Sequence, residues 1–241
     1  MFHPSLTLRL KRNYPSAEFT MIVRFETKPA TFAELHERLG SVPLERIMMA
    51  PAPTTATRQD LITGCEYPYR GCCELIEGTF VLRCSTLLQS VMVGVLGARL
   101  SNFVEQTDAG VVLNSLCPFE FVAGSIRRIS LCFIPWNRLP NDELPDRDIC
   151  EFVPEFTVDF FNESNTAAEL GRRLQEYFDA GIKLAWVIDP RAKTARIHTS
   201  ATKFKLLDET GVLDGGKVLT GFQLPLAELF AAGKKPKKKS R

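Results

Sequence analysis

Residues 154–190 read PEFTVDFFNESNTAAELGRRLQEYFDAGIKLAWVIDP, a stretch that predicts a strand, a helix and a second strand. The run from Phe156 to Phe161 is apolar and β-branched except for Asp159, which is the pattern of a strand buried on both faces. Leu184 to Ile188 is a second apolar run, and it ends at Asp189-Pro190. Two short strands joined by one helix favour a parallel pair with a right-handed crossover.

The predicted helix between these strands has start and stop signals of its own. Thr166 precedes it and Glu169 follows three positions later, so the hydroxyl and the carboxylate can each satisfy a backbone N–H of the first turn. Gly181 ends the helix. An apolar stripe at helical spacing predicts packing against a sheet: Leu170, Leu174, Tyr177 and Phe178. Asp159 then stands out, because a carboxylate in a buried strand is costly unless a cation, a donor or a metal ion compensates it.

Composition indicates a folded chain with a basic end. At 241 residues and 45% hydrophobic content, the chain can bury a core as one domain of ordinary size. The net charge of +2 includes six basic residues among the last eight, so the remainder is mildly acidic, which argues against a broad basic groove for nucleic acid. The tail is interpreted as a solvated polycation, or alternatively as a loose attractor of nucleic acid or of an anionic surface.

Several classes of protein lose their support. Seven cysteines without a CxxC pair make a zinc site improbable and indicate a reduced, cytoplasmic protein. No apolar run reaches the roughly 18 residues of a membrane helix, and the most apolar stretch, Thr86 to Leu100, is expected to be a core helix. The absence of GxGxxG, GxxxxGK[ST], HExxH and GxSxG argues against nucleotide cofactors, zinc proteases and serine hydrolases.

Four regions follow from composition. Residues 1–30 form an extension without a clean period, expected to be partly disordered, and residues 31–59 hold a short helix and a Pro/Thr-rich linker. Residues 60–232 form the main body, and residues 233–241 are the basic, disordered tail. Within the body, Glu77-Gly78 predicts a hairpin turn.

Finer expectations concern one helix, five strands and one histidine. The helix from Thr86 to Val104 is expected to turn Leu87, Val91, Val95 and Leu96 inward. Short strands are expected over residues 111–116, 119–122 and 129–134, and edge strands over residues 195–199 and 204–207. His198 is expected on the solvent face of its strand.

Four blocks of sequence carry a family resemblance: CELIEG at 73–78, RRISLCFIPWNRLP at 127–140, VPEFTVDFFNESNT at 153–166 and EYFDAGIKLAWVIDP at 176–190. Together they resemble the "putative restriction endonuclease" family of the PD-(D/E)XK nuclease superfamily, from about Thr31 to Phe230. The resemblance implies an α/β fold with a mixed central sheet flanked by helices, here with an N-terminal helical extension. It also implies Mg²⁺-dependent cleavage of DNA, since two carboxylates on neighbouring strands hold the ion.

The chain departs from the family pattern at each chemical position. Ser130 stands where the family has its first Asp, and Asp159 stands where it has Glu. The lysine that orients water corresponds to Arg173, which stays protonated and cannot accept a proton. Glu74 keeps its family context. The substitutions therefore predict a nuclease fold with impaired or lost hydrolysis.

Alternative interpretations stay open at this point. Ser130 can be an ordinary strand residue, and Asp159 is expected to pair with Arg173 as a remnant of a metal site. An active enzyme would hold Mg²⁺ through Asp159 and Glu74, with Glu120 as a possible third ligand. A third interpretation is a non-catalytic, dimerising or regulatory subunit. DNA and a second copy of the chain are the partners expected, with no membrane and no nucleotide cofactor.

Overall fold

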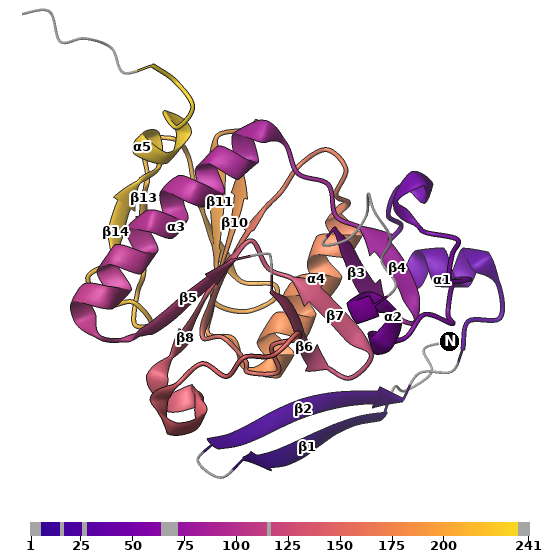
Figure 1. Cartoon of the computed structure of the whole chain (residues 1–241). Helices are drawn as coiled ribbons and strands as arrows, with labels where there is room; N and C mark the ends of the chain where they lie inside the picture. Colours follow the sequence, from indigo (N-terminus) through magenta and orange to yellow (C-terminus); the bar gives the residue numbers. More distant parts are fainter. Residues whose placement is uncertain (1–5, 15–16, 26–27, 64–71, 115–116, 236–241) are drawn as a thin grey trace, which may run out of the picture.

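The strand–helix–strand unit forms as the sequence predicts. β9 (Phe156–Phe160) and β10 (Leu184–Asp189) pair in parallel, and α4 (Ala167–Ala180) joins them. Gly181 adopts a left-handed conformation with φ of 103°, which ends the helix at the residue expected. This unit lies at the centre of the computed structural model, which describes residues 6–14, 17–25, 28–63, 72–114 and 117–235 (Figure 1).

Only one of the two hydrogen bonds predicted for the N-terminal cap of α4 forms. Thr166 Oγ accepts a hydrogen bond from the backbone N–H of Glu169 at 3.0 Å, as expected. The Glu169 carboxylate does not return the bond, because it forms a buried bidentate pair with Arg46, with N–O distances of 2.7 and 2.8 Å. Glu169 therefore ties the segment before the main body to the start of α4.

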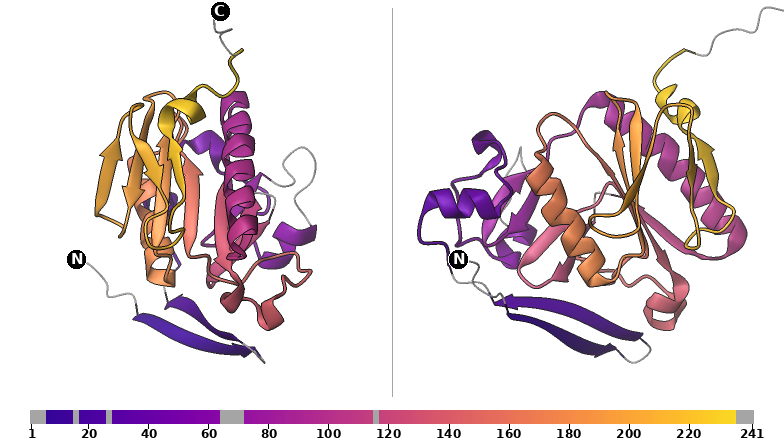
Figure 2. Two further views of the ribbon diagram at one scale, coloured as in Figure 1. Left: turned by 90° about the vertical axis from the view of Figure 1, so that its left-hand side faces the viewer. Right: turned by 180° about the vertical axis from the view of Figure 1, so that it is seen from behind.

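The central sheet is mixed and has the strand order β12-β11-β10-β9-β8-β5. β9 and β10 are parallel, whereas the other neighbouring pairs are antiparallel. Helices lie on both faces of this sheet, so the predicted α/β fold class is confirmed (Figure 2). The bounds of the remaining strands are β5 (Gly110–Asn114), β8 (Leu131–Pro135), β11 (Thr194–His198) and β12 (Phe204–Leu207).

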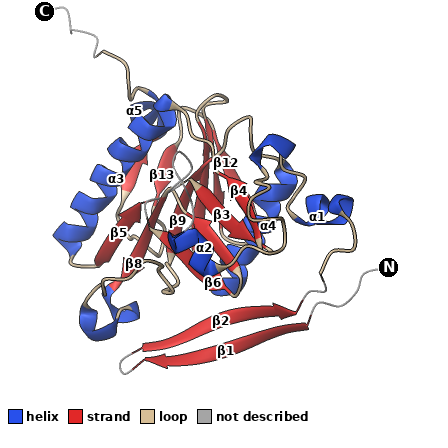
Figure 3. Cartoon of the chain, turned by 45° about the vertical axis from the view of Figure 1, so that its right-hand side comes forward, coloured by secondary structure: helices blue, strands red, loops and turns tan. Residues whose placement is uncertain are grey.

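A second six-stranded sheet has the order β1-β2-β6-β7-β3-β4. Its first two strands form a hairpin of nine residues per strand, which Figure 3 shows extending beside the main body. The sequence predicted no regular element there, so this part of the extension was misjudged; residues 1–5 lie outside the described residues. The strands are β1 (Leu6–Tyr14), β2 (Ala17–Phe25), β3 (Cys73–Ile76), β4 (Thr79–Leu82), β6 (Pro118–Val122) and β7 (Ser125–Arg128).

Short elements complete the chain. β3 and β4 form the hairpin predicted at Glu77-Gly78. The basic tail begins beyond α5, and its residues 236–241 lie outside the described residues. The other elements are α1 (Phe32–Arg38), α2 (Arg58–Thr63), α3 (Leu87–Thr107), α5 (Leu226–Phe230), β13 (Val212–Asp214), β14 (Gln223–Pro225) and 3₁₀ turns at Leu44–Arg46, Trp136–Arg138 and Pro140–Asp142.

The buried face of α3 is not the one predicted. Leu87 is 89% exposed and Val91 is 43% exposed, whereas the inward stripe is Met92, Leu96, Leu100 and Val104. The stripe keeps the spacing of an amphipathic helix but begins with Met92, since Leu87 and Leu88 of the first turn are exposed. Leu96 was assigned correctly.

Within the described part of the chain, α3 is the one helix that is long and apolar enough to span a bilayer. It has 21 residues and a mean hydropathy of 1.4 over its best window, but a core helix of a soluble protein meets the same criteria. Its inward stripe packs against side chains of the sheet, among them Phe133, Phe156 and Trp186.

His198 is buried rather than exposed. It is 3% exposed and lies on β11, which is the second strand of the sheet and not its edge. Its ring packs against Phe204 of β12 with a centroid distance of 4.9 Å, and burial lowers its pKa. The prediction failed because β12 pairs with β11 and places Phe204 against the His198 ring.

Candidate active site

The two sheets meet where the predicted site residues lie. The chain passes from β7 to β8 through Ile129 and Ser130, so the strand predicted over residues 129–134 forms but begins at Leu131. β8 pairs with β9, which brings Ser130 beside Asp159, and β3 pairs with β7, which brings Glu74 to the same place. α4 packs over this junction with Arg173. All four side chains are buried.

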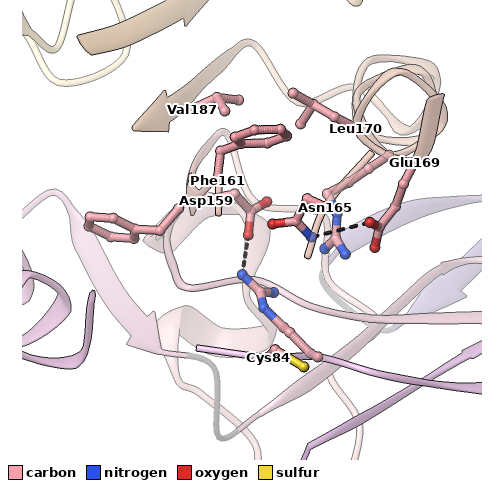
Figure 4. A pocket seen from close by; sticks show the side chains of 10 residues that line it. Cys84, Asp159, Phe161, Asn165, Glu169, Leu170 and Val187 are labelled. Carbon is pink, nitrogen blue, oxygen red and sulfur yellow. Dashed lines mark hydrogen bonds and ion pairs between the residues drawn. The ribbon is translucent and has the colours of Figure 1, made fainter. Parts of the chain in front are cut away.

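An arginine that the sequence interpretation missed links these groups. Arg83 follows β4 directly, and its Nη2 donates to Asp159 Oδ1 at 2.6 Å and to Ser130 Oγ at 2.7 Å. Its Nη1 lies 3.6 Å from Glu74 Oε1. Figure 4 labels Asp159 and marks its ion pair with a dashed line. One cation thus contacts all three oxygen-bearing positions that the family resemblance assigns to the reaction centre.

The expected pair between Asp159 and Arg173 does not form. The second oxygen of Asp159 instead accepts a hydrogen bond from the hydroxyl of Tyr177 at 2.6 Å. Tyr177 lies one turn beyond Arg173 on α4, so it meets the strand where Arg173 was expected to reach. Burial, followed by the charge of Asp159, raises the pKa of Tyr177 far above its usual value, and the phenol remains a donor.

Arg173 binds Glu74 in a bidentate pair, with N–O distances of 2.7 and 3.0 Å. Glu74 also accepts from the backbone N–H of Arg128 at 2.9 Å and from Arg127 Nη1 at 3.2 Å. Burial alone would raise the pKa of Glu74, but the charges of Arg173, Arg127 and Arg83 outweigh burial and hold the pKa far below the usual value.

A further buried ion pair lies behind this cluster. Arg127 binds Glu176 of α4 through Nε at 2.7 Å and Nη2 at 3.0 Å, and both side chains are about 1% exposed. Arg172 also donates to Glu176 at 3.0 Å. Burial opposes ionisation of Glu176, but the charges and hydrogen bonds of Arg127 and Arg172 outweigh burial and lower its pKa to about 2. Both carboxylates therefore stay charged and paired at neutral pH.

Glu120, the possible third ligand, is engaged elsewhere. Its carboxylate pairs with Arg58 of α2 at 3.0 Å, and the same Arg58 nitrogen binds Glu151 at 2.7 Å. Within the described part of the chain, no three His, Cys, Asp or Glu side chains gather as a group that could hold a metal ion. Glu120 consequently does not complete a set with Asp159 and Glu74.

The residues present do not fit a magnesium ion. Mg²⁺ requires near-octahedral oxygen ligands at about 2.0–2.1 Å and tolerates no competing cation at its position. Here each oxygen of Asp159 and Glu74 already accepts from a protein donor. The guanidinium of Arg83 also supplies positive charge between Asp159, Ser130 and Glu74.

The missed residues had different signals in the sequence. Tyr177 lies four positions after Arg173, so both occupy one helix face and Tyr177 could have been expected near Asp159. Arg127, with Arg128 beside it, precedes the apolar run 129–134 and could have been read as a buried pair that needed carboxylates. Arg83 carries no comparable local signal, because it follows a strand like any loop residue.

The fold and the site define this protein as a member of the restriction endonuclease-like class. The sequence pattern of the Uma2 family, described as "Putative restriction endonuclease", matches residues 69–227. The chain belongs to this family.

A structural relative agrees with this assignment. The chain is similar to the crystal structure of a putative nuclease belonging to DUF820 from Anabaena variabilis ATCC 29413, with a TM-score of 0.57 and 16% sequence identity. The match covers 66% of this chain and 89% of that chain, and at this identity it shows the shared fold. No curated protein matches the chain.

Proposed function

We propose that this protein is a restriction endonuclease-like protein in which an arginine takes the place of the catalytic metal ion, so that it acts by binding and not by cleavage. The observation that carries the proposal is the position of Arg83, which contacts Asp159, Ser130 and Glu74 together. A guanidinium there neutralises the carboxylates that a metal would need and does not acidify water as a metal ion does.

The changes at the other PD-(D/E)XK positions support the same proposal. Ser130 offers a neutral hydroxyl where the family pattern has a carboxylate, and a neutral oxygen is a poor ligand for Mg²⁺. Arg173 remains protonated and is held in a bidentate pair with Glu74, so it is not available to orient a water molecule. Each of these losses acts on the same reaction barrier, and their effects compound.

Metal binding and cleavage test the proposal directly. Isothermal titration calorimetry with Mg²⁺ and Mn²⁺ is expected to show no binding in the micromolar range. Supercoiled plasmid is expected to stay intact in either metal. Micromolar metal binding together with plasmid nicking that a chelator abolishes would overturn the proposal and favour an active enzyme that uses Asp159 and Glu74.

A reversion series identifies which group blocks the metal. The triple change Ser130→Asp, Asp159→Glu and Arg173→Lys restores the family pattern but leaves Arg83 in the centre. We expect weak metal binding until Arg83→Ala is added, because that change removes the competing cation. The control adds Arg99→Ala instead, since Arg99 is 61% exposed and pairs only loosely with Glu228 at 3.6 Å. Equal metal affinity in both quadruple variants would show that Arg83 is not the block.

A further inference from the structure

A cavity of about 300 Å³ lies next to Arg83 on the side of the sheet that α3 covers. Its lining includes Arg83 at the end of β4, Arg128 at the end of β7 and Ser130 between β7 and β8. Ser90 of α3 and Asn114 of β5 contribute to the opposite wall. The cavity therefore adjoins the proposed inactive centre and shares Arg83 and Ser130 with it.

The charge around this cavity differs from that on the other side of Arg83. The hollow toward α4 measures about 20 Å³, and its lining sets Asp159 and Glu169 against Arg83 and Arg173. The lining of the larger cavity contains two arginines, and none of its described lining residues is an aspartate or a glutamate. The larger cavity therefore favours an anion more than the smaller hollow does.

Arg83 has donor capacity that the protein does not use. Its Nη1 is buried and has no hydrogen-bond acceptor among the described atoms; the nearest carboxylate oxygen, of Glu74, lies 3.6 Å away. A buried N–H group without an acceptor is costly, and hydrogen bonds within the protein therefore satisfy the Arg83 guanidinium only in part. Ser130 Oγ accepts from Arg83, which leaves the hydroxyl proton of Ser130 able to donate to a ligand in the cavity.

We infer that this cavity binds the phosphate monoester group of a small ligand without a metal ion. Guanidinium groups bind phosphate oxygens in pairs of hydrogen bonds, and a monoester dianion presents more charge to them than a diester does. A volume of about 300 Å³ is at the small end of ligand pockets, which suits a terminal phosphate with one attached residue better than a continuous strand. The inference rests on the proposed loss of the metal.

The sources of such a phosphate can be separated in one binding assay with EDTA present. Fluorescence anisotropy would compare a labelled short oligonucleotide carrying a 5′-phosphate with the same oligonucleotide carrying a 5′-hydroxyl. We expect the phosphorylated form to bind about tenfold or more tightly, since one charged hydrogen bond is worth about 1.5–3 kcal/mol. Inorganic phosphate is expected to compete. Equal affinities that inorganic phosphate does not change would mean that internal phosphodiesters are bound, and would overturn the inference.

A matched pair of variants locates the binding. Ser90→Trp places a large ring in the cavity from an exposed position of α3 and leaves the ion pairs untouched. The control, Ser101→Trp, is exposed on the same helix and is absent from the described lining of the cavity. Loss of phosphate-dependent binding in the Ser90 variant alone supports the site, whereas unchanged binding overturns it. Because EDTA is present throughout, either result leaves the metal-binding test of the proposed function independent.

Discussion

The two faces of the central sheet differ in the kind of side chain that they bury. On the face toward α3, alternate residues of β8, β9 and β10 join one large apolar cluster with the helix, and Phe156 and Trp186 pack edge to face at 4.6 Å. On the face toward α4, the intervening positions include Asp159, which is held by Tyr177 and Arg83. Because side chains alternate along a strand, β9 contributes apolar side chains to the core beside α3 and Asp159 to the polar network beside α4.

This difference shows where the fold can tolerate change. Burial of apolar groups is not directional, so the α3 face depends mainly on volume and shape. The α4 face depends on each charge keeping its partner, because an isolated buried ion is far costlier than a lost methyl group. The α4 face is therefore the more easily broken by a single substitution, and it contains the candidate site.

The largest effect is expected from Arg127→Met. The substitution keeps much of the volume but leaves Glu176 without its bidentate partner and removes one of the cations around Glu74. Breaking a buried pair from one side costs about 3–5 kcal/mol of unfolding free energy. Urea denaturation followed by circular dichroism measures the loss.

Arg99→Met is the control, because Arg99 and Glu228 are both more than half exposed. It should cost less than about 1 kcal/mol. Similar losses for the two variants would contradict the contrast between the faces.

The sequence predicted the central strand–helix–strand unit better than the contacts among the site residues. Local periodicity located β9, α4 and β10, and the family pattern pointed to Ser130, Glu74 and Asp159. Partner choice depends on distant residues: Arg83 lies 76 positions from Asp159, and Arg173 lies 99 positions from Glu74. No local pattern carries that information.

The N-terminal hairpin was missed for another reason. Leu6, Leu8 and Leu10 alternate with polar residues, which is a strand signal, but the irregular sequence around them obscures it. Helical spacing shows that α3 has an apolar stripe, but it does not say which stripe faces the sheet. The buried face of α3 was misjudged for this reason.

The next effect concerns the apolar face. Leu96→Ala removes a fully buried side chain from the α3 stripe and should cost about 2–5 kcal/mol, with the exact value set by how far the cavity collapses. Leu87→Ala changes a residue that is 89% exposed, and we expect a change within about 0.5 kcal/mol. Thermal and urea denaturation would measure both. A loss for Leu87 as large as the loss for Leu96 would restore the helix face predicted from the sequence.

Acid should weaken the α4 face before the α3 face. The folded-state pKa of Glu176 is about 2, below the usual 4.5, so this group adds stability above pH 4.5 and loses its contribution as pH falls toward 2. Glu74 shifts in the same direction. Urea midpoints measured from pH 6 to pH 2.5 should fall steeply below pH 4.5.

The comparison variant for this experiment is Glu176→Gln, which cannot titrate at this position. It should begin with lower stability at pH 6 and lose less of it between pH 4.5 and pH 2.5. A parallel decline in both proteins would show that other carboxylates control acid unfolding.

The smallest effects separate the caps of the two helices. Thr86→Ala removes the hydroxyl of the α3 capping box and should cost about 1 kcal/mol. Thr166→Ala should cost about twice as much, because that hydroxyl accepts from Glu169 at the start of α4 and also donates to the carbonyl of Gly40 in the preceding segment. Equal losses in urea denaturation would mean that the bond to Gly40 adds nothing. A larger loss for Thr166 would show that even the cap of α4 depends on distant contacts, whereas the cap of α3 is a local device.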